Sequence, residues 1–313
     1  MRKIAITGAA GFIGSNLAQR LSQTYDVVAI DNLSYGLLEQ VPHGVHFVRA
    51  DIRDPELGDA LAGCDTVFHL AAKNCIPDCE ADPAETVSIN VEGTVNVLEA
   101  CRREGIERII LAETSALYEG VAVLPSREEV VAPQSIYAIS KFAAIPFARR
   151  YERSCGMKLT ALRYFNVYGP RQDYRRTIPP IMSAFVIKLL KGERPIVYGT
   201  GMKRRDFIFV DDVNDFHQLC LSHPGTIGKT FNVGSGSNHS VLDIYGAVSA
   251  MLGIGIPPEY RPDMPGDEAQ ATLADISAAM ALGWKPRVSL DEGLRRSVEF
   301  IREHVLAHDN LTH

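Results

Sequence analysis

The segment from Gly8 to Gly14, which reads Gly-Ala-Ala-Gly-Phe-Ile-Gly, constrains the fold more than any other part of this chain. It follows an apolar run, residues 3–7, that is typical of a strand, and it opens a helical pattern over residues 13–21. Glycines at this spacing let the backbone turn tightly and approach a pyrophosphate at the positive end of the following helix. The sequence therefore predicts a strand–turn–helix unit that binds a dinucleotide. The alternative is a tight turn without a ligand.

Apolar runs and helical patterns alternate through the first half of the chain. Strands are predicted over residues 3–7, 26–30, 45–50, 66–71, 108–112 and 159–165, and helices over 13–21, 84–105 and 137–155. This alternation is typical of βαβ units and a parallel sheet covered on both faces. Later strands are predicted over 205–210 and 230–234, and short helices follow residue 241 up to a last helix over 290–304.

We therefore expect an α/β fold, a Rossmann-type doubly wound parallel sheet with a smaller, partly interleaved C-terminal lobe. The nucleotide-binding domain is predicted over residues 1–165 and about 206–240, and the substrate lobe over 166–205 and 241–313.

Composition excludes several classes of protein. Lysine plus arginine is 32 and aspartate plus glutamate is 38, so the formal charge of −6 argues against a nucleic-acid binder. The longest stretch without a charged residue runs from Ile4 to Gln19 and is too short to cross a membrane. Six cysteines form no CxxC pair, and nine histidines show no metal-ligand spacing. We expect a cytoplasmic protein with reduced thiols and without a metal, a membrane or a nucleic-acid partner.

Asp31 ends the second predicted strand, where a carboxylate accepts hydrogen bonds from the ribose diol of NAD. Its charge would repel the 2′-phosphate of NADP, and no arginine adjoins it, so the sequence favours NAD. A turn or helix cap is the alternative role for Asp31. Asp51 and Ile52, just after the third strand, are predicted to meet the adenine.

Tyr137 and Lys141 lie one turn apart on one face of the helix predicted over 137–155. A nearby ammonium favours tyrosinate and lowers a pKa that starts near 10. Such a tyrosine can act as a general base toward a sugar hydroxyl. The alternative is a half-buried structural tyrosine beside a surface lysine.

With the glycine segment, these residues resemble those of the extended short-chain dehydrogenase/reductases, specifically the nucleotide-sugar epimerases and dehydratases, and most of all the 4-epimerases of UDP-glucose and UDP-GlcNAc. The resemblance runs from residue 1 to about 303 and is carried by segments 7–14, 31–34, 69–72, 90–94, 137–141, 163–169 and 205–208. It implies an NAD site made of Gly8, Gly11, Phe12, Ile13, Gly14, Asp31, Asn32, Asp51, Ile52, Leu70, Ala71, Ala72, Asn90, Tyr137, Lys141 and Tyr164.

The resemblance also implies a mechanism. Tyr137 would take the proton from the sugar 4-OH while the hydride from C4 passes to NAD, and the hydride would return to the other face of the turned 4-keto sugar. Lys141 would keep the pKa of Tyr137 low and bind the nicotinamide ribose, and Thr114 would bridge the 4-OH and Tyr137, with Ser115 as a second candidate. NAD would be regenerated in each cycle and stay tightly held.

The positions after Thr114 separate the reactions of the family. Dehydratases carry an Asp-Glu pair there, and decarboxylases of nucleotide-linked glucuronate carry a glutamate at the position of Ala116. Ser115 and Ala116 cannot transfer those protons, so the sequence favours a C4 epimerase. A reductase, dehydratase or decarboxylase and a non-catalytic NAD-binding protein remain as alternatives.

For the nucleotide-sugar substrate, the resemblance assigns the diphosphate to Asn166 and Arg205 and the uracil to Val197 and Tyr198, beside Thr114 and Tyr137. The basic stretches 171–176 and 203–205 are interpreted as anion contacts around this pocket. Thr272 occupies a position where a small side chain admits N-acetyl groups, so we expect UDP-GlcNAc and UDP-GalNAc to be tolerated.

Two positions depart from the family. Met264 stands where a second phosphate arginine is usual, for which Arg261 or Arg171 could compensate. Glu113 stands where a small residue is usual, and the sequence assigns it no role.

The resemblance further implies a homodimer. It would pair helices near 90–105 and 137–155 through an apolar face with Leu98, Phe142 and Phe147.

Overall fold

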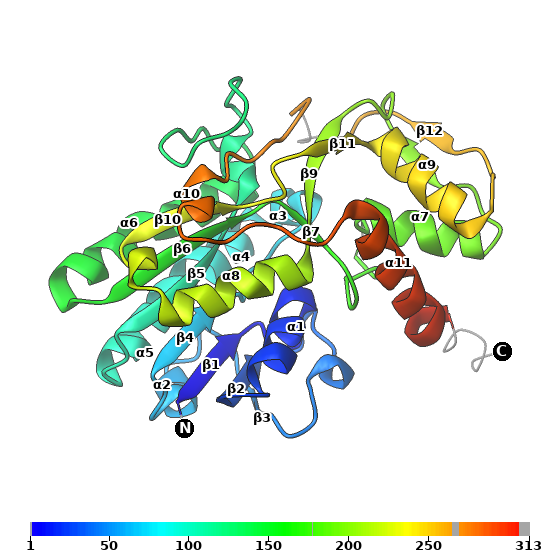
Figure 1. Ribbon diagram of the computed structural model, residues 1–313. Helices are drawn as coiled ribbons and strands as arrows, with labels where there is room; N and C mark the ends of the chain where they lie inside the picture. The colour runs from blue at the N-terminus through cyan, green and yellow to red at the C-terminus, as the bar shows by residue number, and fades with distance from the viewer. Residues whose placement is uncertain (1, 177, 265–268, 307–313) are drawn as a thin grey trace.

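The computed structural model describes residues 2–176, 178–264 and 269–306. Its centre is a seven-stranded sheet in the order β10-β6-β5-β4-β1-β2-β3, in which every neighbouring pair is parallel (Figure 1). The strands are β1 (Lys3–Thr7), β2 (Asp26–Asp31), β3 (His46–Arg49), β4 (Thr66–His69), β5 (Arg108–Thr114), β6 (Lys158–Tyr164) and β10 (Lys229–Val233). The predicted doubly wound parallel sheet is confirmed. The order in which the chain adds strands reverses between β1 and β4.

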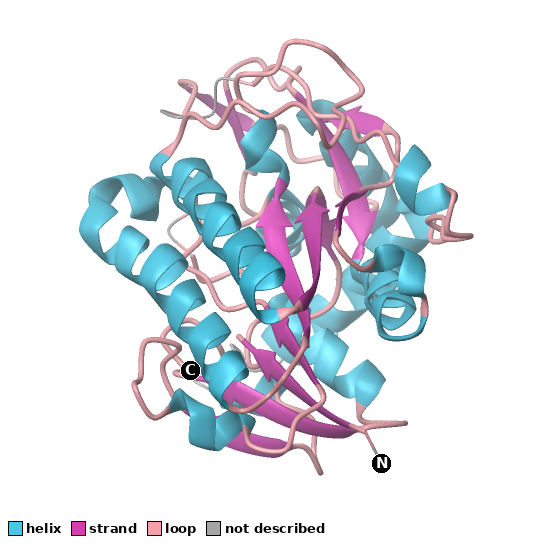
Figure 2. Cartoon of the chain, turned by 90° about the vertical axis from the view of Figure 1, so that its left-hand side faces the viewer, coloured by secondary structure: helices cyan, strands magenta, loops and turns pink. Residues whose placement is uncertain are grey.

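Helices cover both faces of this sheet, and Figure 2 shows them flanking the strands on either side. On one face lie α1 (Phe12–Leu21) and α8 (Val210–Ser222), around a core that includes Ile4, Phe68 and Phe216. The other face carries α2 (Leu57–Leu61), α5 (Gly93–Arg103) and α6 (Ile136–Cys155), around Ala5, Val97 and Leu159. The apolar strands are therefore buried on both sides, as their composition predicts.

The helix predicted over 84–105 is divided. It consists of α4 (Pro83–Val87), a π-helical turn (Ser88–Glu92) and α5, and a short α3 (Ile76–Ala81) precedes it. The π-helical turn contains the buried Asn90, whose side chain bonds to neighbouring segments of the chain. Wider turns of this kind are frequent at functional sites.

The C-terminal lobe packs its own core beside the carboxyl ends of the strands (Figure 1). Three strands form one small sheet, β7 (Asn166–Tyr168), β9 (Arg204–Phe209) and β11 (Asn238–Ser240), and β8 (Ile196–Tyr198) pairs with β12 (Glu259–Arg261). The larger helices are α7 (Ile181–Leu190), α9 (Val241–Leu252) and α11 (Leu290–Phe300), which continues as a π-helical turn (Ile301–Leu306).

Short elements complete the described chain. They are the 3-10 helices η1 (Leu38–Gln40), η3 (Ser115–Tyr118) and η4 (Pro224–Thr226), and α10 (Ser277–Met280), which packs on β10. Within residues 206–240, α8 and β10 belong to the layers of the large sheet, whereas β9 and β11 belong to the small one. The interleaving is plain, and the domain boundaries themselves stay a prediction.

The apolar face expected between subunits differs from the prediction at one residue. Leu98 is wrong as a member, because it is fully buried in the core under α5. Exposed apolar side chains on α6 are Ile139, Phe142 and Phe147. The homodimer stays a prediction.

Within the described ranges, no helix combines the length and the apolar character that a membrane crossing requires. The same residues contain no group of histidine, cysteine or acidic side chains that could hold a metal ion.

Candidate active site

A cavity of about 640 Å³ opens at the carboxyl ends of the central strands and continues to the C-terminal lobe. Ligands of open α/β sheets bind at this edge, beside the point where the order of the strands reverses. Twenty residues predicted from the sequence line it: Gly8, Gly11, Phe12, Ile13, Gly14, Asp31, Asn32, Asp51, Ile52, Leu70, Ala71, Ala72, Thr114, Tyr137, Lys141, Tyr164, Asn166, Tyr198, Arg205 and Thr272. Residues that are far apart in the chain are thus brought to one wall.

The glycine turn lies between β1 and α1 and has no room for larger residues. Gly8 has a φ of +73°, and a Cβ there would lie 2.8 Å from the backbone nitrogen of Ala71. A Cβ on Gly14 would collide with the carbonyl oxygen of Gly8 and lie 2.8 Å from Cα of Ala9. No side chain caps α1, so its first amides face the cavity. This cradle fits a pyrophosphate at a helix N-terminus.

Asp31 ties the second strand to this turn. Its Oδ2 accepts a hydrogen bond from the backbone N–H of Ala10 at 3.0 Å, and its Oδ1 accepts one from Leu33 at 2.8 Å. Burial raises the pKa of Asp31, and these two amides oppose the rise. Each oxygen keeps a second lone pair, so Asp31 can both cap the turn and accept a ribose hydroxyl.

The part of the cavity that is predicted to meet the adenine is lined by a network of polar side chains around Asp51. Asp51 forms an ion pair with Arg53, 2.8 Å from Nη2 to Oδ2, and accepts a hydrogen bond from the Asn32 amide at 2.9 Å. Bonds from Arg53 hold the pKa of Asp51 well below its usual range. Asp51 is therefore an ionised carboxylate that is held in place in the cavity wall by Arg53 and Asn32.

Tyr137 and Lys141 share the cavity-facing side of α6, and Thr114 ends the neighbouring strand β5. The hydroxyl of Thr114 accepts the backbone N–H of Ala116 at 3.1 Å, and it is near enough to the phenol of Tyr137 to oppose the rise in the pKa of that tyrosine. The three residues predicted to be catalytic are thus gathered in one place.

One electrostatic expectation needs correction. Burial raises the pKa of Tyr137, opposed by the hydroxyl of Thr114 and the charge of Arg176, rather than leaving it lowered by Lys141. Burial also lowers the pKa of Lys141 to about 8, while the charge of Glu113 opposes the change. In this structure burial outweighs the groups that oppose the rise in the pKa of Tyr137.

Two of the residues assigned from the sequence, Asn90 and Val197, do not line the cavity. Asn90 is buried outside the cavity, where it bonds to Lys73 and Ser140. Val197 is fully buried in the core of the C-terminal lobe and does not line the cavity, unlike Tyr198. Tyr164 lines the cavity, but its hydroxyl is 2.6 Å from Nε2 of His217 in the core. Strand alternation, which points neighbouring side chains to opposite faces, explains Val197.

Neither proposed substitute for the missing phosphate arginine lines the cavity. Arg171 binds the carbonyl of Ser15 and the side chain of Gln19 on α1, and Arg261 pairs with Glu259. Met264 itself lines the cavity, and the Gly266-Asp267 pair beside it lies outside the described residues.

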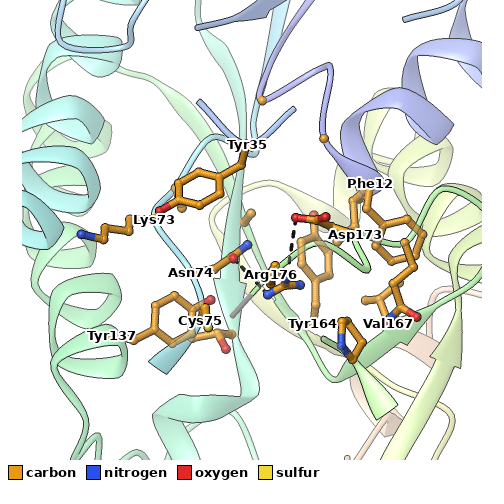
Figure 3. Close-up of a pocket in the computed structure, with 18 of the residues that line it drawn as sticks. Phe12, Tyr35, Lys73, Asn74, Cys75, Tyr137, Tyr164, Val167, Asp173 and Arg176 are labelled. Carbon is orange, nitrogen blue, oxygen red and sulfur yellow. Dashed lines mark hydrogen bonds and ion pairs between the residues drawn. The ribbon is translucent and has the colours of Figure 1, made fainter. Parts of the chain in front are cut away.

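Other lining residues were not assigned individually to a ligand from the sequence; they include Tyr35, Lys73, Asn74, Arg175 and Arg176, most of which are labelled in Figure 3. The basic stretch 171–176 was the available signal for the two arginines. The loop carrying them crosses toward the first half of the chain, where Arg175 donates to the carbonyl of Tyr35 at 2.9 Å and Arg176 to Oδ1 of Asn74 at 3.1 Å.

Comparisons with known proteins agree with this site. Residues 4–234 match the model of the NAD dependent epimerase/dehydratase family. A UDP-glucose 4-epimerase of Mycolicibacterium smegmatis is 34% identical over 95% of this chain and 97% of its own length. The crystal structure of UDP-glucose 4-epimerase from Thermotoga maritima with UDP-glucose has a TM-score of 0.92 and 34% identity, over 96% of this chain and 99% of that one.

A UDP-glucuronic acid 4-epimerase from Bacillus cereus, in complex with UDP-glucuronic acid and NAD, is also similar, with a TM-score of 0.89 and 30% identity over 96% of this chain and 99% of that one. The glycine cradle, the Tyr137–Lys141 pair and these matches together establish that the chain belongs to the NAD-dependent epimerase/dehydratase family and converts nucleotide sugars.

Proposed function

We propose that this protein is a 4-epimerase of a UDP-hexose or UDP-N-acetylhexosamine that works through a transient 4-keto sugar. The observation that carries the proposal is that Thr114, Tyr137 and Lys141 lie together on the cavity wall. A base at this place can take one proton from a sugar hydroxyl and give it back, which is the proton chemistry that epimerisation at C4 requires.

Each catalytic side chain has a separate task. Thr114 accepts a bond from Ala116 through its oxygen, so its own proton remains available to Tyr137 or the sugar 4-OH. Tyr137 takes the 4-OH proton and returns it after the ketone has turned. Lys141 would bind the nicotinamide ribose, and its positive charge stabilises tyrosinate. When bound, NAD supplies the hydride acceptor and donor and a further positive charge that favours tyrosinate.

The residues after Thr114 support epimerisation over the competing reactions. Loss of water or of CO₂ from a 4-keto sugar needs an acid or base near C5. Ser115 and Ala116 line the cavity at the N-terminus of η3 and supply no carboxyl group. Decarboxylation or dehydration would need a proton donor from elsewhere on the wall.

Thr272 supports a pocket that accepts N-acetyl groups. It lines the cavity, and its hydroxyl accepts the backbone N–H of Asp206 at 3.2 Å. Its small volume leaves space that a bulky side chain would fill, and a difference of this size is worth ~1–3 kcal/mol in discrimination. We propose tolerance of acetylated sugars rather than a requirement for them.

Proton NMR of the purified protein tests the function. The protein is mixed with UDP-GlcNAc and then with UDP-glucose, first without added NAD and then with it, and new galacto-configured anomeric signals show 4-epimerisation. Tyr137→Phe should lower the rate by about 10²–10⁴-fold. Tyr260→Phe, on the exposed strand β12, serves as the control. With NAD supplied, absence of an epimer from UDP-glucose, UDP-GlcNAc and UDP-glucuronate alike would reject the proposal.

A further inference from the structure

Arg176 reaches the part of the cavity where the proposed base lies. Figure 3 shows its guanidinium between Tyr137 on one side and Asp173 on the other, beside Asn74. Nη1 donates to Oδ1 of Asn74 at 3.1 Å. The positive charge of Arg176 works against the burial that raises the pKa values of Tyr137 and Cys75, so the three groups are within electrostatic reach of one another.

The carboxylates near Arg176 are mostly engaged elsewhere. Asp173 lies 4.0 Å from Nε of Arg176, and it accepts the backbone N–H of Arg175 at 3.0 Å. The charge of Glu119 contributes to the raised pKa of Tyr137. The carboxylate of Glu119 accepts hydrogen bonds from the backbone N–H groups of Gln134 and Ser135, just before α6. A half-buried guanidinium facing a cavity therefore has weak compensation, and an anionic ligand would supply it.

The position of Arg176 identifies which part of a substrate carries that anion. Tyr137 and Thr114 mark the sugar C4 in the proposed function, on which this inference rests. The diphosphate is attached at C1, across the ring from C4, whereas C6 is separated from C4 only by C5. A cation beside Tyr137 therefore meets a substituent at C6. We infer that the preferred substrate is a UDP-hexuronate, whose C6 carboxylate is bound by Arg176 and Asn74.

This assignment also bears on which product forms. A 4-keto hexuronate is a β-keto acid, which loses CO₂ when the C5–C6 bond breaks and its electron pair moves to C5 and the C4 oxygen; a proton must then be added at C5. An ion pair with Arg176 stabilises the carboxylate charge that this step would remove. Ser115 and Ala116 supply no acid for C5. The carboxylate is retained, and the net reaction is an isomerisation that needs no further reactant.

The test compares two substrates in matched variants. We expect wild-type kcat/KM, measured by NMR, to be higher for UDP-glucuronate than for UDP-glucose, with UDP-galacturonate as the product. Arg176→Gln should reduce the ratio of the two values by about tenfold or more, because a hydrogen bond between charged groups is lost. Arg175→Gln removes the same charge from the same loop, and should change the ratio much less, because Arg175 is exposed and is bonded to the carbonyl of Tyr35 and paired with Asp173.

Equal or better turnover of UDP-glucose by the wild type, or an unchanged ratio in Arg176→Gln, would overturn the inference. Release of CO₂ with a UDP-pentose would overturn the predicted retention of the carboxylate. Calorimetric Kd values for both UDP-sugars on Tyr137→Phe protein separate binding from chemistry. If the wild type epimerises neither a UDP-hexose nor UDP-glucuronate, the proposed function fails, while a Kd preference for UDP-glucuronate that depends on Arg176 would still support the anion site.

Discussion

Glu113 on β5 and Arg163 on β6 form a buried ion pair, with 2.8 Å between Oε2 and Nε and only 3% and 7% of the side chains exposed. The two residues are direct partners across β5 and β6. Arg163 also donates to the hydroxyl of Tyr118 and the carbonyl of Glu128. The other oxygen of Glu113 has no partner among the described residues, and it borders, with Lys141, a space of about 20 Å³ that suits one water.

This pair should make Glu113→Gln strongly destabilising. Removing one charge leaves Arg163 buried and uncompensated, which typically costs about 3–5 kcal/mol. Urea unfolding of Glu113→Gln, Arg163→Met and the double variant measures the effect and the coupling between the two residues. We expect the double variant to be less destabilised than the sum of the single ones. A loss below about 1 kcal/mol in Glu113→Gln, as for surface pairs, would contradict a buried and unscreened pair.

A second prediction concerns the glycine cradle. Gly14→Ala places a Cβ against the Gly8 carbonyl and 2.8 Å from Cα of Ala9, and both are backbone atoms that cannot move aside cheaply. The turn should open, and the protein should purify with little bound NAD, which is measured by releasing the nucleotide and quantifying it. Gly246→Ala is the matched control because its Cβ meets nothing within 4 Å in α9.

Helix propensity predicts that Gly246→Ala is neutral or more stable by up to about 1 kcal/mol. Full NAD occupancy in Gly14→Ala protein would show that the turn adapts, and would reject the close approach as the reason for glycine.

The bounds of several strands and helices could be predicted from the sequence, and others could not. The strands of the parallel sheet are runs of apolar residues buried on both faces, so β1 and β2 appear within one residue of their predicted bounds. Strand β4 ends at His69 rather than residue 71, because the chain leaves the sheet at its carboxyl edge to form the cavity wall. The break at Ser88–Glu92 was missed because the helical pattern continues through it while Asn90 bonds outside the helix.

Ion pairs and pKa shifts depend on contacts between residues that are far apart in the chain, and the spacing of residues in the sequence does not reveal these contacts. Arg163 is fifty positions from Glu113, and only the register of β5 and β6 pairs them. The basic stretch 171–176 predicted anion contacts, but the path of the loop turns Arg171 to α1 and Arg176 to the cavity. The raised pKa of Tyr137 follows from burial, which the Tyr–Lys spacing alone does not reveal.

Asn90 should act by positioning the loop that follows β4. Its amide donates to the carbonyl of Lys73 at 3.0 Å and to Oγ of Ser140 at 2.9 Å, and its oxygen accepts the backbone N–H of Lys73 at 2.8 Å. Asn90→Ala leaves these buried groups unpaired, at about 1–3 kcal/mol for each. We expect a lower free energy of unfolding and faster amide exchange at residues 73–75.

Asn96→Ala is a comparison on the same helical stretch, because Asn96 bonds to the carbonyls of Ile52 and Asp54. Faster exchange at 73–75 in both variants would point to general loosening rather than to a role specific to Asn90.

Two buried histidines predict how stability changes with acid. Burial lowers the pKa values of His69 and His217 to about 3, from 6.5 in the unfolded chain; the charge of Lys141 adds to the shift at His69. The unfolded state therefore binds more protons than the folded state between pH 6.5 and 3, so each histidine makes stability fall as the pH drops through that window. The slope is about 1.4 kcal/mol per pH unit for each histidine.

Replacing one histidine should remove its share of this slope. In His69→Gln, the side-chain amide can still pair with the hydroxyls of Thr7 and Thr94, which His69 contacts at 2.8 and 3.0 Å. Free energies of unfolding at pH 7 and pH 4 for the wild type and His69→Gln give the difference directly, because carboxylates that titrate in this range are common to both proteins. The variant should lose less stability on acidification. Equal losses would mean that His69 is protonated in the folded protein, and that burial does not control its charge.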